Sequence, residues 1–87
     1  MSDRQLLEFP CRFPIKAMGR DQAGFDELVR DIIAARVCPE HLHDLTVRPS
    51  RGGRFISVTV TITASSQDQL DDIYRALTAH ERVLMAL

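Results

Sequence analysis

The sequence indicates its fold most clearly in the run GGRFISVTVTITA, at residues 52–64. From Ile56 to Ala64, apolar and polar side chains alternate without interruption, and this period of two is typical of a β-strand that buries one face. The preceding pair Gly52-Gly53 favours a tight hairpin. The stretch is therefore predicted to be a hairpin turn followed by a half-buried strand.

Shorter alternating patterns on the amino-terminal side predict two more strands. Residues 12–19 alternate and end at Gly19, which closes the segment. Residues 45–50 alternate as well, and Pro49 suits a sheet edge or a strand end, because proline cannot donate a ladder hydrogen bond. Both segments are predicted strands.

Two segments have the three- and four-residue spacing of amphipathic helices. The first is predicted to begin with Asp21 as its capping residue and to stop near Cys38, because Pro39 disfavours helical geometry in the residue before it. The second is predicted to begin at Ser66 or the serine before it, with Gln69 placed for a capping box behind Ser66. The apolar positions of the two helices are Phe25, Leu28, Val29, Ile32, Ile33 and Val37, then Leu70, Ile73, Tyr74 and Leu77.

Residues 82–87 are largely apolar with no breaker and predict a final strand, so the element order is βαββαβ. With right-handed crossovers, this order gives the ferredoxin-like α+β sandwich. Such a fold has a four-stranded antiparallel sheet, in the order 4-1-3-2, with both helices on one face. The other face stays open, and its predicted lining is Lys16, Met18, Thr46, Arg48, Ser57, Thr59, Thr61 and either Leu84 or Met85.

The composition is that of an ordinary globular domain. The 87 residues are 45% apolar and 26% charged, with a mean hydropathy of −0.10, which excludes disordered, collagen-like and low-complexity classes. This length supports one modest core, so residues 1–87 are predicted to form a single domain, with residues 1–8 as a flexible tail. Eleven basic and twelve acidic residues give a net charge of −1, so no overall positive field attracts nucleic acid or a membrane surface.

The sequence also predicts a cytoplasmic protein. No basic region is followed by an apolar stretch at its start, and no run reaches the roughly eighteen apolar residues of a membrane span. Cys11 and Cys38 lack the Cys-x-x-Cys spacing and are too few for a disulfide framework, so they are expected to be free thiols. Together with His41 and His43 they could converge at one end of the fold with zinc-compatible chemistry, but their spacing matches no closed zinc signature and no metal is expected.

Three segments stand out by motif and spacing. They are LEFP at residues 7–10 running into FPIKAMG at 13–19, VRPS at 47–50 with Gly53, and SVTV at 57–60. Together they resemble the YbeD-like family of small bacterial proteins of unknown function, over nearly the whole chain. The resemblance implies a cytoplasmic βαββαβ domain similar in fold to ACT regulatory domains. Some members carry a lipoate-regulation label, which implies a link to lipoate metabolism.

Residues 19–25 look like the turn at which ACT domains receive an amino-acid ligand. Free amides and the positive end of a helix favour a carboxylate there, and Gly24 permits close approach. This interpretation assigns Gly19, Asp21 and Gly24 to a ligand site, although Ala23 stands where ACT domains usually have proline. The alternative is an ordinary capped helix with a glycine in its first turn.

A basic hairpin is the second candidate site. Arg48, Arg51 and Arg54 surround the glycine pair, and clustered arginines suit bidentate contacts with a phosphate, a carboxylate or an acidic patch on a partner. Lys16 on the open face and Phe55 after the hairpin, where the family often carries tyrosine, complete the predicted partner-binding set. The alternative is a solvated hairpin whose charges keep an edge strand from pairing with other sheets.

Neither an RNA-binding nor an enzymatic function is favoured by the motifs. Residues 51–56 invite comparison with RNA-recognition motifs, but Gly53 replaces the first aromatic residue and Lys16 stands where a second stacking ring belongs. The chain has no Gly-rich phosphate loop, nucleophile elbow or paired metal-binding carboxylates, so no catalytic residue and no cofactor are predicted.

Two functions stay open. The first is a non-enzymatic regulatory or adaptor domain that binds a protein partner through the open face, the basic hairpin or the apolar last strand. Because that last strand lies at a sheet edge, it could also pair with a second copy of the chain. The second function is an ACT-like module that senses an amino acid or another small carboxylate at residues 19–25.

Overall fold

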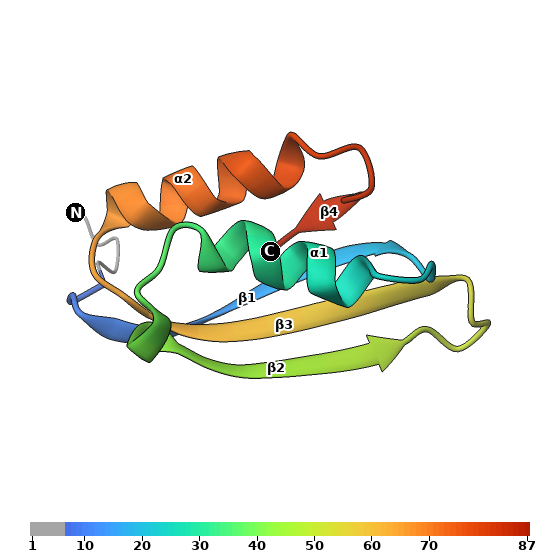
Figure 1. Cartoon of the computed structure of the whole chain (residues 1–87), viewed down its shortest axis with the longest axis horizontal. Helices are drawn as coiled ribbons and strands as arrows, with labels where there is room; N and C mark the ends of the chain where they lie inside the picture. Colours follow the sequence, from blue (N-terminus) through green and yellow to red (C-terminus); the bar gives the residue numbers. More distant parts are fainter. Residues whose placement is uncertain (1–6) are drawn as a thin grey trace, which may run out of the picture.

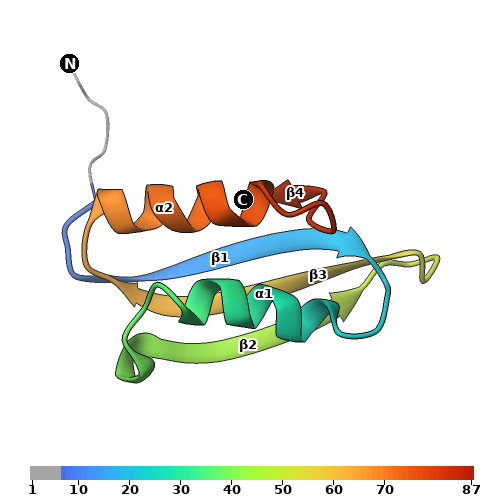
Figure 2. The same ribbon diagram turned by 45° about the horizontal axis from the view of Figure 1, so that its top comes forward.

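The computed structural model describes residues 7–87 and has the predicted βαββαβ order (Figure 1). The strands are β1 (Cys11–Arg20), β2 (Leu42–Pro49), β3 (Phe55–Ala64) and β4 (Met85–Ala86); the helices are α1 (Phe25–Ala34) and α2 (Gln67–Thr78), with a 3-10 turn η1 (Pro39–His41) before β2. The sheet is antiparallel, in the order β2-β3-β1-β4, and both helices lie on one face of it (Figure 2). The predicted ferredoxin-like fold is confirmed. Residues 1–6 of the predicted tail lie outside the described residues.

The core lies between the two helices and the central strands β1 and β3. These strands pair in register from Cys11 opposite Ala64 to Arg20 opposite Phe55. Every second side chain therefore points to the helices, and a buried Val, Leu, Ile or Phe side chain contributes about 1.5–3 kcal/mol. The buried residues form one cluster: Ile15, Ala17, Phe25, Val29, Ile33, Val37, Val58, Val60, Ile62, Ala64, Leu70, Ile73, Leu77 and Val83.

The start of α2 matches its local sequence signal. The Ser66 hydroxyl accepts a hydrogen bond of 3.0 Å from the Gln69 backbone N–H, as a capping residue should. The Gln69 side-chain oxygen accepts from the Ser65 backbone N–H at 2.7 Å, and its amide nitrogen donates to the Arg36 carbonyl at 2.9 Å. Gln69 therefore bonds back to Ser65, one residue before the predicted partner Ser66, and it also ties α2 to the end of the α1 region.

Replacing Ser66 with alanine is expected to lower the free energy of unfolding by about 1 kcal/mol, because the first turn of α2 loses its side-chain acceptor. Urea unfolding followed by circular dichroism measures the loss. Ser65→Ala is the comparison variant, because it removes the 3.1 Å bond from the Ser65 hydroxyl to Gln69 Oε1 but keeps the backbone bond and the Ser66 cap, so a smaller loss is expected. Equal losses in both variants would contradict the assignment of Ser66 as the cap.

The prediction that Asp21 caps the first helix is wrong. The capping position is Gly24, whose φ is 82°, and no side chain caps the helix there. The Asp21 backbone N–H donates instead to the Arg54 carbonyl at 2.8 Å, which holds residues 21–24 in a turn ahead of the helix. The helix also ends earlier than predicted, at Ala34, because the chain turns before Val37 enters the core.

The last strand is much shorter than the predicted one at residues 82–87. Residues 80–83 make a turn in which the Val83 N–H donates to the His80 carbonyl at 3.0 Å, and Val83 is buried in the core. Met85 and Ala86 form β4, where they pair with Met18 and Ala17 of β1, and the flanking Leu84 and Leu87 also hydrogen-bond to the backbone of that strand. Core packing therefore accounts for Val83 alone, since Leu84, Met85 and Leu87 are exposed.

The predicted second strand begins three residues earlier than expected, at Leu42, and ends at Pro49. The predicted tight turn is a wider loop at residues 50–54, closed by the Ser50 N–H donating to the Phe55 carbonyl at 2.8 Å. Of the two glycines only Gly53 has a positive φ, at 75°.

Among residues 7–87, neither helix has the length and apolar character that a membrane span requires.

Candidate functional site

The open face of the sheet carries two rows of aligned side chains near the β2–β3 loop. Lys16 of β1 pairs with Thr59 of β3, and Thr59 pairs with Thr46 of β2. In the next row, Met18 pairs with Ser57, which pairs with Arg48. Because register partners point to the same face, these side chains converge on a hollow of about 260 Å³ that is lined by Lys16, Thr46, Arg48, Ser57 and Thr59. The last-strand residue facing Met18 is Met85 rather than Leu84.

A second, smaller hollow of about 140 Å³ adjoins the first toward the loop. Its lining is more apolar and consists of Met18, Arg48, Pro49, Ser50, Phe55, Ile56 and Ser57. Arg48 and Ser57 belong to both hollows. The first hollow is lined mainly by hydroxyls, and the second is bordered by an exposed aromatic ring, Phe55, at 38% exposure.

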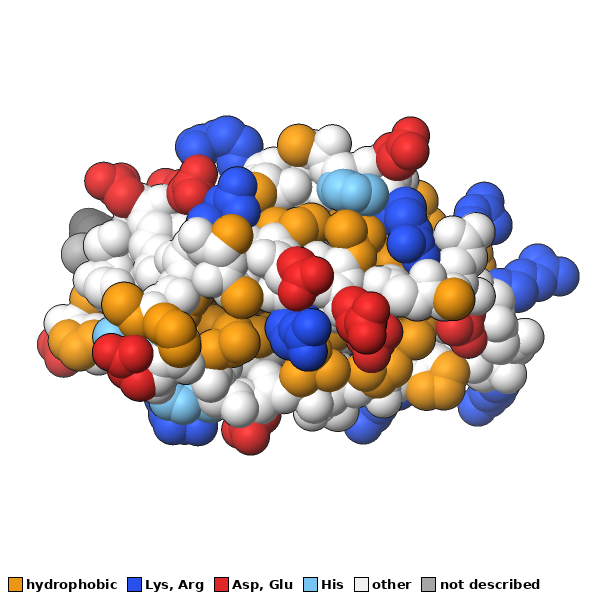
Figure 3. Space-filling model, viewed as in Figure 1, with side chains coloured by type: hydrophobic (Ala, Val, Ile, Leu, Met, Phe, Trp, Pro, Cys, Tyr) orange, Lys and Arg blue, Asp and Glu red, His pale blue; other side chains and the backbone are white. Residues whose placement is uncertain are grey.

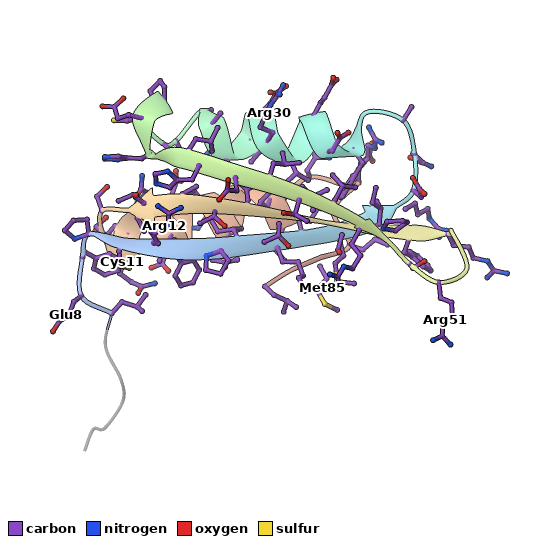
Figure 4. The ribbon with its side chains drawn as sticks, turned by 90° about the horizontal axis from the view of Figure 1, so that it is seen from below. Glu8, Cys11, Arg12, Arg30, Arg51 and Met85 are labelled. Atoms are coloured by element: carbon purple, nitrogen blue, oxygen red, sulfur yellow. The ribbon has the colours of Figure 1, made fainter. Side chains whose placement is uncertain are left out.

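The remaining predicted partner-binding residues lie on the loop. Arg51 is at its outer end and points away from the sheet (Figure 4). Arg54 is held by its backbone, whose carbonyl accepts from the Asp21 N–H. The structure therefore brings Lys16, Arg48 and Phe55 together around the two hollows and places Arg51 and Arg54 beside them as a charged margin.

Arg20 is a member of this basic end that the sequence analysis missed. Its guanidinium carbon lies 5.9 Å from the centre of the Phe55 ring, within the range of a cation–π contact. The signal was present in the antiparallel pairing, because the last residue of β1 must face the first residue of β3. We name the set Lys16, Arg20, Arg48, Arg51, Arg54 and Phe55 the basic end of the sheet.

The cations of the basic end differ in their ion pairing from most other arginines of the chain. Within the part of the chain that the structure describes, its five cations form no salt bridge, whereas Arg12, Arg30, Arg36 and Arg75 do. Arg12, at the other end of the open face, lies 3.8 Å from Asp44, and Arg36 lies 3.1 Å from Asp72. Free arginines beside serine and threonine hydroxyls provide hydrogen-bond donors for an oxyanion.

The turn at residues 19–25 has a structural role that its sequence did not indicate. A Cβ added at Gly19 would lie 2.5 Å from the Arg82 carbonyl oxygen and 2.6 Å from the Phe25 ring, so packing requires glycine there. Gly24, at φ 82°, faces open space. The first turn of α1 carries Asp26 and Glu27, which already occupy its positive end and repel a further anion.

The four residues considered for zinc do not form a site. Among residues 7–87, no three His, Cys, Asp or Glu side chains lie close enough together to hold a metal ion. Cys11 and Cys38 are free thiols, and His43 Nε2 is hydrogen-bonded to the Thr63 hydroxyl at 2.6 Å. His43 lies on the exposed edge strand β2, and its ring turns to Thr63 of β3.

A third hollow, of about 300 Å³, lies between the helices and includes Ile32, Arg36 and His80 in its lining. Arg36 is already paired with Asp72. Nearby on α2, burial raises the pKa of the Tyr74 phenol above its ordinary 10.0, so this group stays neutral at physiological pH. Neither feature adds an unpaired charge, and the basic end remains the stronger candidate site.

Comparison with solved structures supports the fold. The chain is similar to the solution structure of protein HP0495 from H. pylori, with a TM-score of 0.73 at 12% identity, covering 99% of this chain and 90% of the other. It is also similar to the ACT domain from the GTP pyrophosphokinase of Chlorobium tepidum, with a TM-score of 0.68 at 13% identity, covering 87% and 94%. At these identities the likeness concerns the fold alone.

Sequence relatives define the family. The chain is 44% identical over 89 residues to a UPF0250 protein of Chromobacterium violaceum, with all of both chains covered. It is 43% identical over 82 residues to one of Neisseria gonorrhoeae, covering 94% of this chain and 90% of the relative. Residues 4–87 match the family described as "Protein of unknown function (DUF493)". No enzyme activity is indicated for these relatives. The chain belongs to this DUF493 family, which is the YbeD-like family that its motifs resemble.

Proposed function

We propose that this protein is a non-enzymatic adaptor or regulatory domain that binds an acidic segment of a protein partner at the basic end of its sheet. The observation that carries the proposal is the concentration of five cations without an acidic partner among residues 7–87, in a chain whose net charge is −1. Five exposed cations in one place repel one another, so binding of an anionic partner there is electrostatically favourable.

The two adjoining hollows indicate what kind of segment fits. Lys16 and Arg48 border the hydroxyl-lined hollow, where a carboxylate would accept hydrogen bonds from both cations. Met18 and Phe55 border the second hollow, which suits an apolar side chain of the same segment. A partner segment with acidic residues next to one apolar residue would use both, and the apolar anchor would supply most of the affinity.

The triple variant Arg48→Glu/Arg51→Glu/Arg54→Glu is expected to lose the partner, because three attractive contacts become repulsive. The measurement is affinity capture from the lysate of the source organism, with mass spectrometry of what wild type and variant retain. A titration of a short polyglutamate peptide, followed by amide NMR shifts of Lys16, Arg48 and Phe55, tests the charge preference directly.

The matched control reverses three exposed arginines elsewhere, Arg12→Glu/Arg30→Glu/Arg75→Glu, and changes the net charge equally. Its weak surface ion pairs contribute less than about 1 kcal/mol each, so folding is expected to survive. Equal loss of the partner in both variants would assign the effect to total charge and contradict a specific site. A partner retained by the basic-end variant would also overturn the proposal.

A second candidate is an ACT-like sensor of a small carboxylate at Gly19, Asp21 and Gly24. The likeness to an ACT domain favours it, as does a helix start at Gly24 without a side-chain cap. The acids Asp26 and Glu27 in the first turn weigh against it. A ligand at a hundred times its Kd would stabilise the fold by about 2.7 kcal/mol, so thermal unfolding with a panel of amino acids decides between the two functions.

The identity of a captured partner also tests the link to lipoate metabolism, which the motif resemblance to the YbeD-like family implies. Retention of a lipoate-handling or lipoylated protein by wild type, and its loss from the basic-end variant, is the expected result under that link. Cytoplasmic residence belongs to the same proposal, and the two free thiols, Cys11 and Cys38, are what a reducing compartment favours.

A further inference from the structure

β2 is the outer strand of the sheet on the side away from β4, and no other strand among residues 7–87 pairs with its outer side (Figure 1). The Ser50 N–H donates to the Phe55 carbonyl, which fixes the alternation of hydrogen-bonded pairs along β2 and β3. Counting back in steps of two, Arg48 and Thr46 direct their N–H and C=O groups toward β3. Leu45 and Val47 therefore direct theirs toward the open edge.

The same two residues leave apolar surface uncovered on the helix side of the sheet. Leu45 is 38% exposed and Val47 is 39% exposed, although both pair with buried valines of β3. In Figure 3, hydrophobic side chains lie at the surface along the lower side of the molecule, where Figure 1 places β2. The edge of β2 thus combines free backbone groups with apolar side chains that a neighbouring strand would cover.

On the other side of the sheet, the exposed side chains of β2 carry opposite charges. Asp44 and Arg48 stand four residues apart on the open face, with Thr46 midway between them. Charges on an edge strand prevent pairing where a second copy would bring like charges opposite each other. Asp44 and Arg48 instead lie symmetrically about the neutral Thr46. When two copies of β2 pair antiparallel, each charge can therefore meet an opposite charge of the other copy.

We propose that β2 pairs with β2 of a second copy of this chain, antiparallel about a two-fold axis at Thr46. Asp44 then lies opposite the partner's Arg48, and Arg48 lies opposite the partner's Asp44. Leu45 lies opposite the partner's Val47, and these two residues exchange backbone hydrogen bonds because both direct them outward. The apolar pair is covered on the helix side, and the two sheets become one.

The charges select this register over its neighbours. An axis at Asp44 places two aspartates opposite each other, and an axis at Arg48 places two arginines opposite each other, both of which are unfavourable. An axis at Leu45 or Val47 places Asp44 and Arg48 opposite uncharged residues of the second copy. Only the axis at Thr46 pairs both charges with an opposite charge and keeps the outward backbone groups in phase.

The proposal does not depend on the proposed function, but it shares Arg48 with it. In the dimer both open faces point the same way, so the two basic ends would lie on one continuous surface. A partner carboxylate and the second copy's Asp44 would compete for Arg48. An acidic peptide is therefore expected to weaken self-association of the wild type.

The test is sedimentation equilibrium of the full chain, whose mass is 9.8 kDa, over a range of concentrations. Wild type is expected to approach twice this mass. Asp44→Arg and Arg48→Asp, each alone, place like charges opposite each other at both ends of the contact and are expected to weaken dimerisation roughly tenfold or more. An equimolar mixture of the two variants restores opposite charges at both positions, so it is expected to recover the dimer, as is the double variant.

Two further measurements keep the outcomes separate. Arg51→Glu, on the loop rather than on the strand, is expected to leave the dimer unchanged while weakening capture of an acidic partner. Hydrogen exchange of the Leu45 and Val47 amides is expected to slow as the dimer forms. A wild type that stays monomeric at millimolar concentration would overturn the proposal, and so would a dimer that both single charge variants leave intact.

Discussion

Replacing Phe25 with alanine is expected to lower the free energy of unfolding by about 3–5 kcal/mol. Phe25 begins α1 and is 1% exposed, and its ring packs against Gly19 of β1. The Arg82 guanidinium carbon lies 5.9 Å from the ring centre, and this side chain also donates to the Ala23 carbonyl. The ring therefore joins the start of α1, the end of β1 and the segment before β4, and its removal leaves a cavity between them.

The loss is large relative to the whole fold. A chain of this length has a total stability on the order of 4–13 kcal/mol, so the variant is expected to be partly unfolded at 37 °C. Urea titration of wild type and variant measures the difference. Phe55→Ala is the matched control, because it deletes the same ring at a surface site that is 38% exposed. If both variants lost the same stability, the assignment of Phe25 to the core would be wrong.

Local patterns predicted the elements whose formation depends on near neighbours in the sequence. The alternation from Ile56 to Ala64 identified β3, because a strand with one buried face must alternate. Ser66 and Gln69 identified the start of α2, because their hydrogen bonds join residues at most four apart. The order of strands followed from connection lengths and handedness alone.

The wrong predictions concern elements whose ends are set by contacts with distant parts of the chain. Asp21 has the side chain of a helix cap, but its backbone is held by Arg54 from the β2–β3 loop, so the helix begins later. The last strand is short because Val83 enters the core instead of following the sheet edge. Both outcomes depend on contacts between residues more than thirty positions apart or on burial in the core, which no local pattern contains.

The candidate site was likewise predicted in part from the sequence. Its charged residues were visible in the sequence, because arginines around a glycine pair are conspicuous. The two hollows were not, since they depend on the register that sets Lys16 beside Thr59 and Met18 beside Ser57. Arg20 was missed for that reason, although the pairing of β1 with β3 places it over Phe55.

Replacing Gly19 with alanine is expected to lower the free energy of unfolding by about 1–3 kcal/mol, because the added methyl group has no space. Its Cβ would lie 2.5 Å from the Arg82 carbonyl oxygen, a backbone atom that cannot turn aside as a side chain can. Gly52→Ala is the matched control, since nothing lies within 4 Å of a Cβ there, and its stability is expected to change by less than about 0.5 kcal/mol. Urea unfolding of both variants gives the comparison. If Gly19→Ala left the stability unchanged, β1 and the segment at Arg82 would not be in contact. Residues 19–25 would then again be a candidate turn whose glycine serves a ligand. The expected loss of stability, in contrast, assigns Gly19 to the packing of the fold.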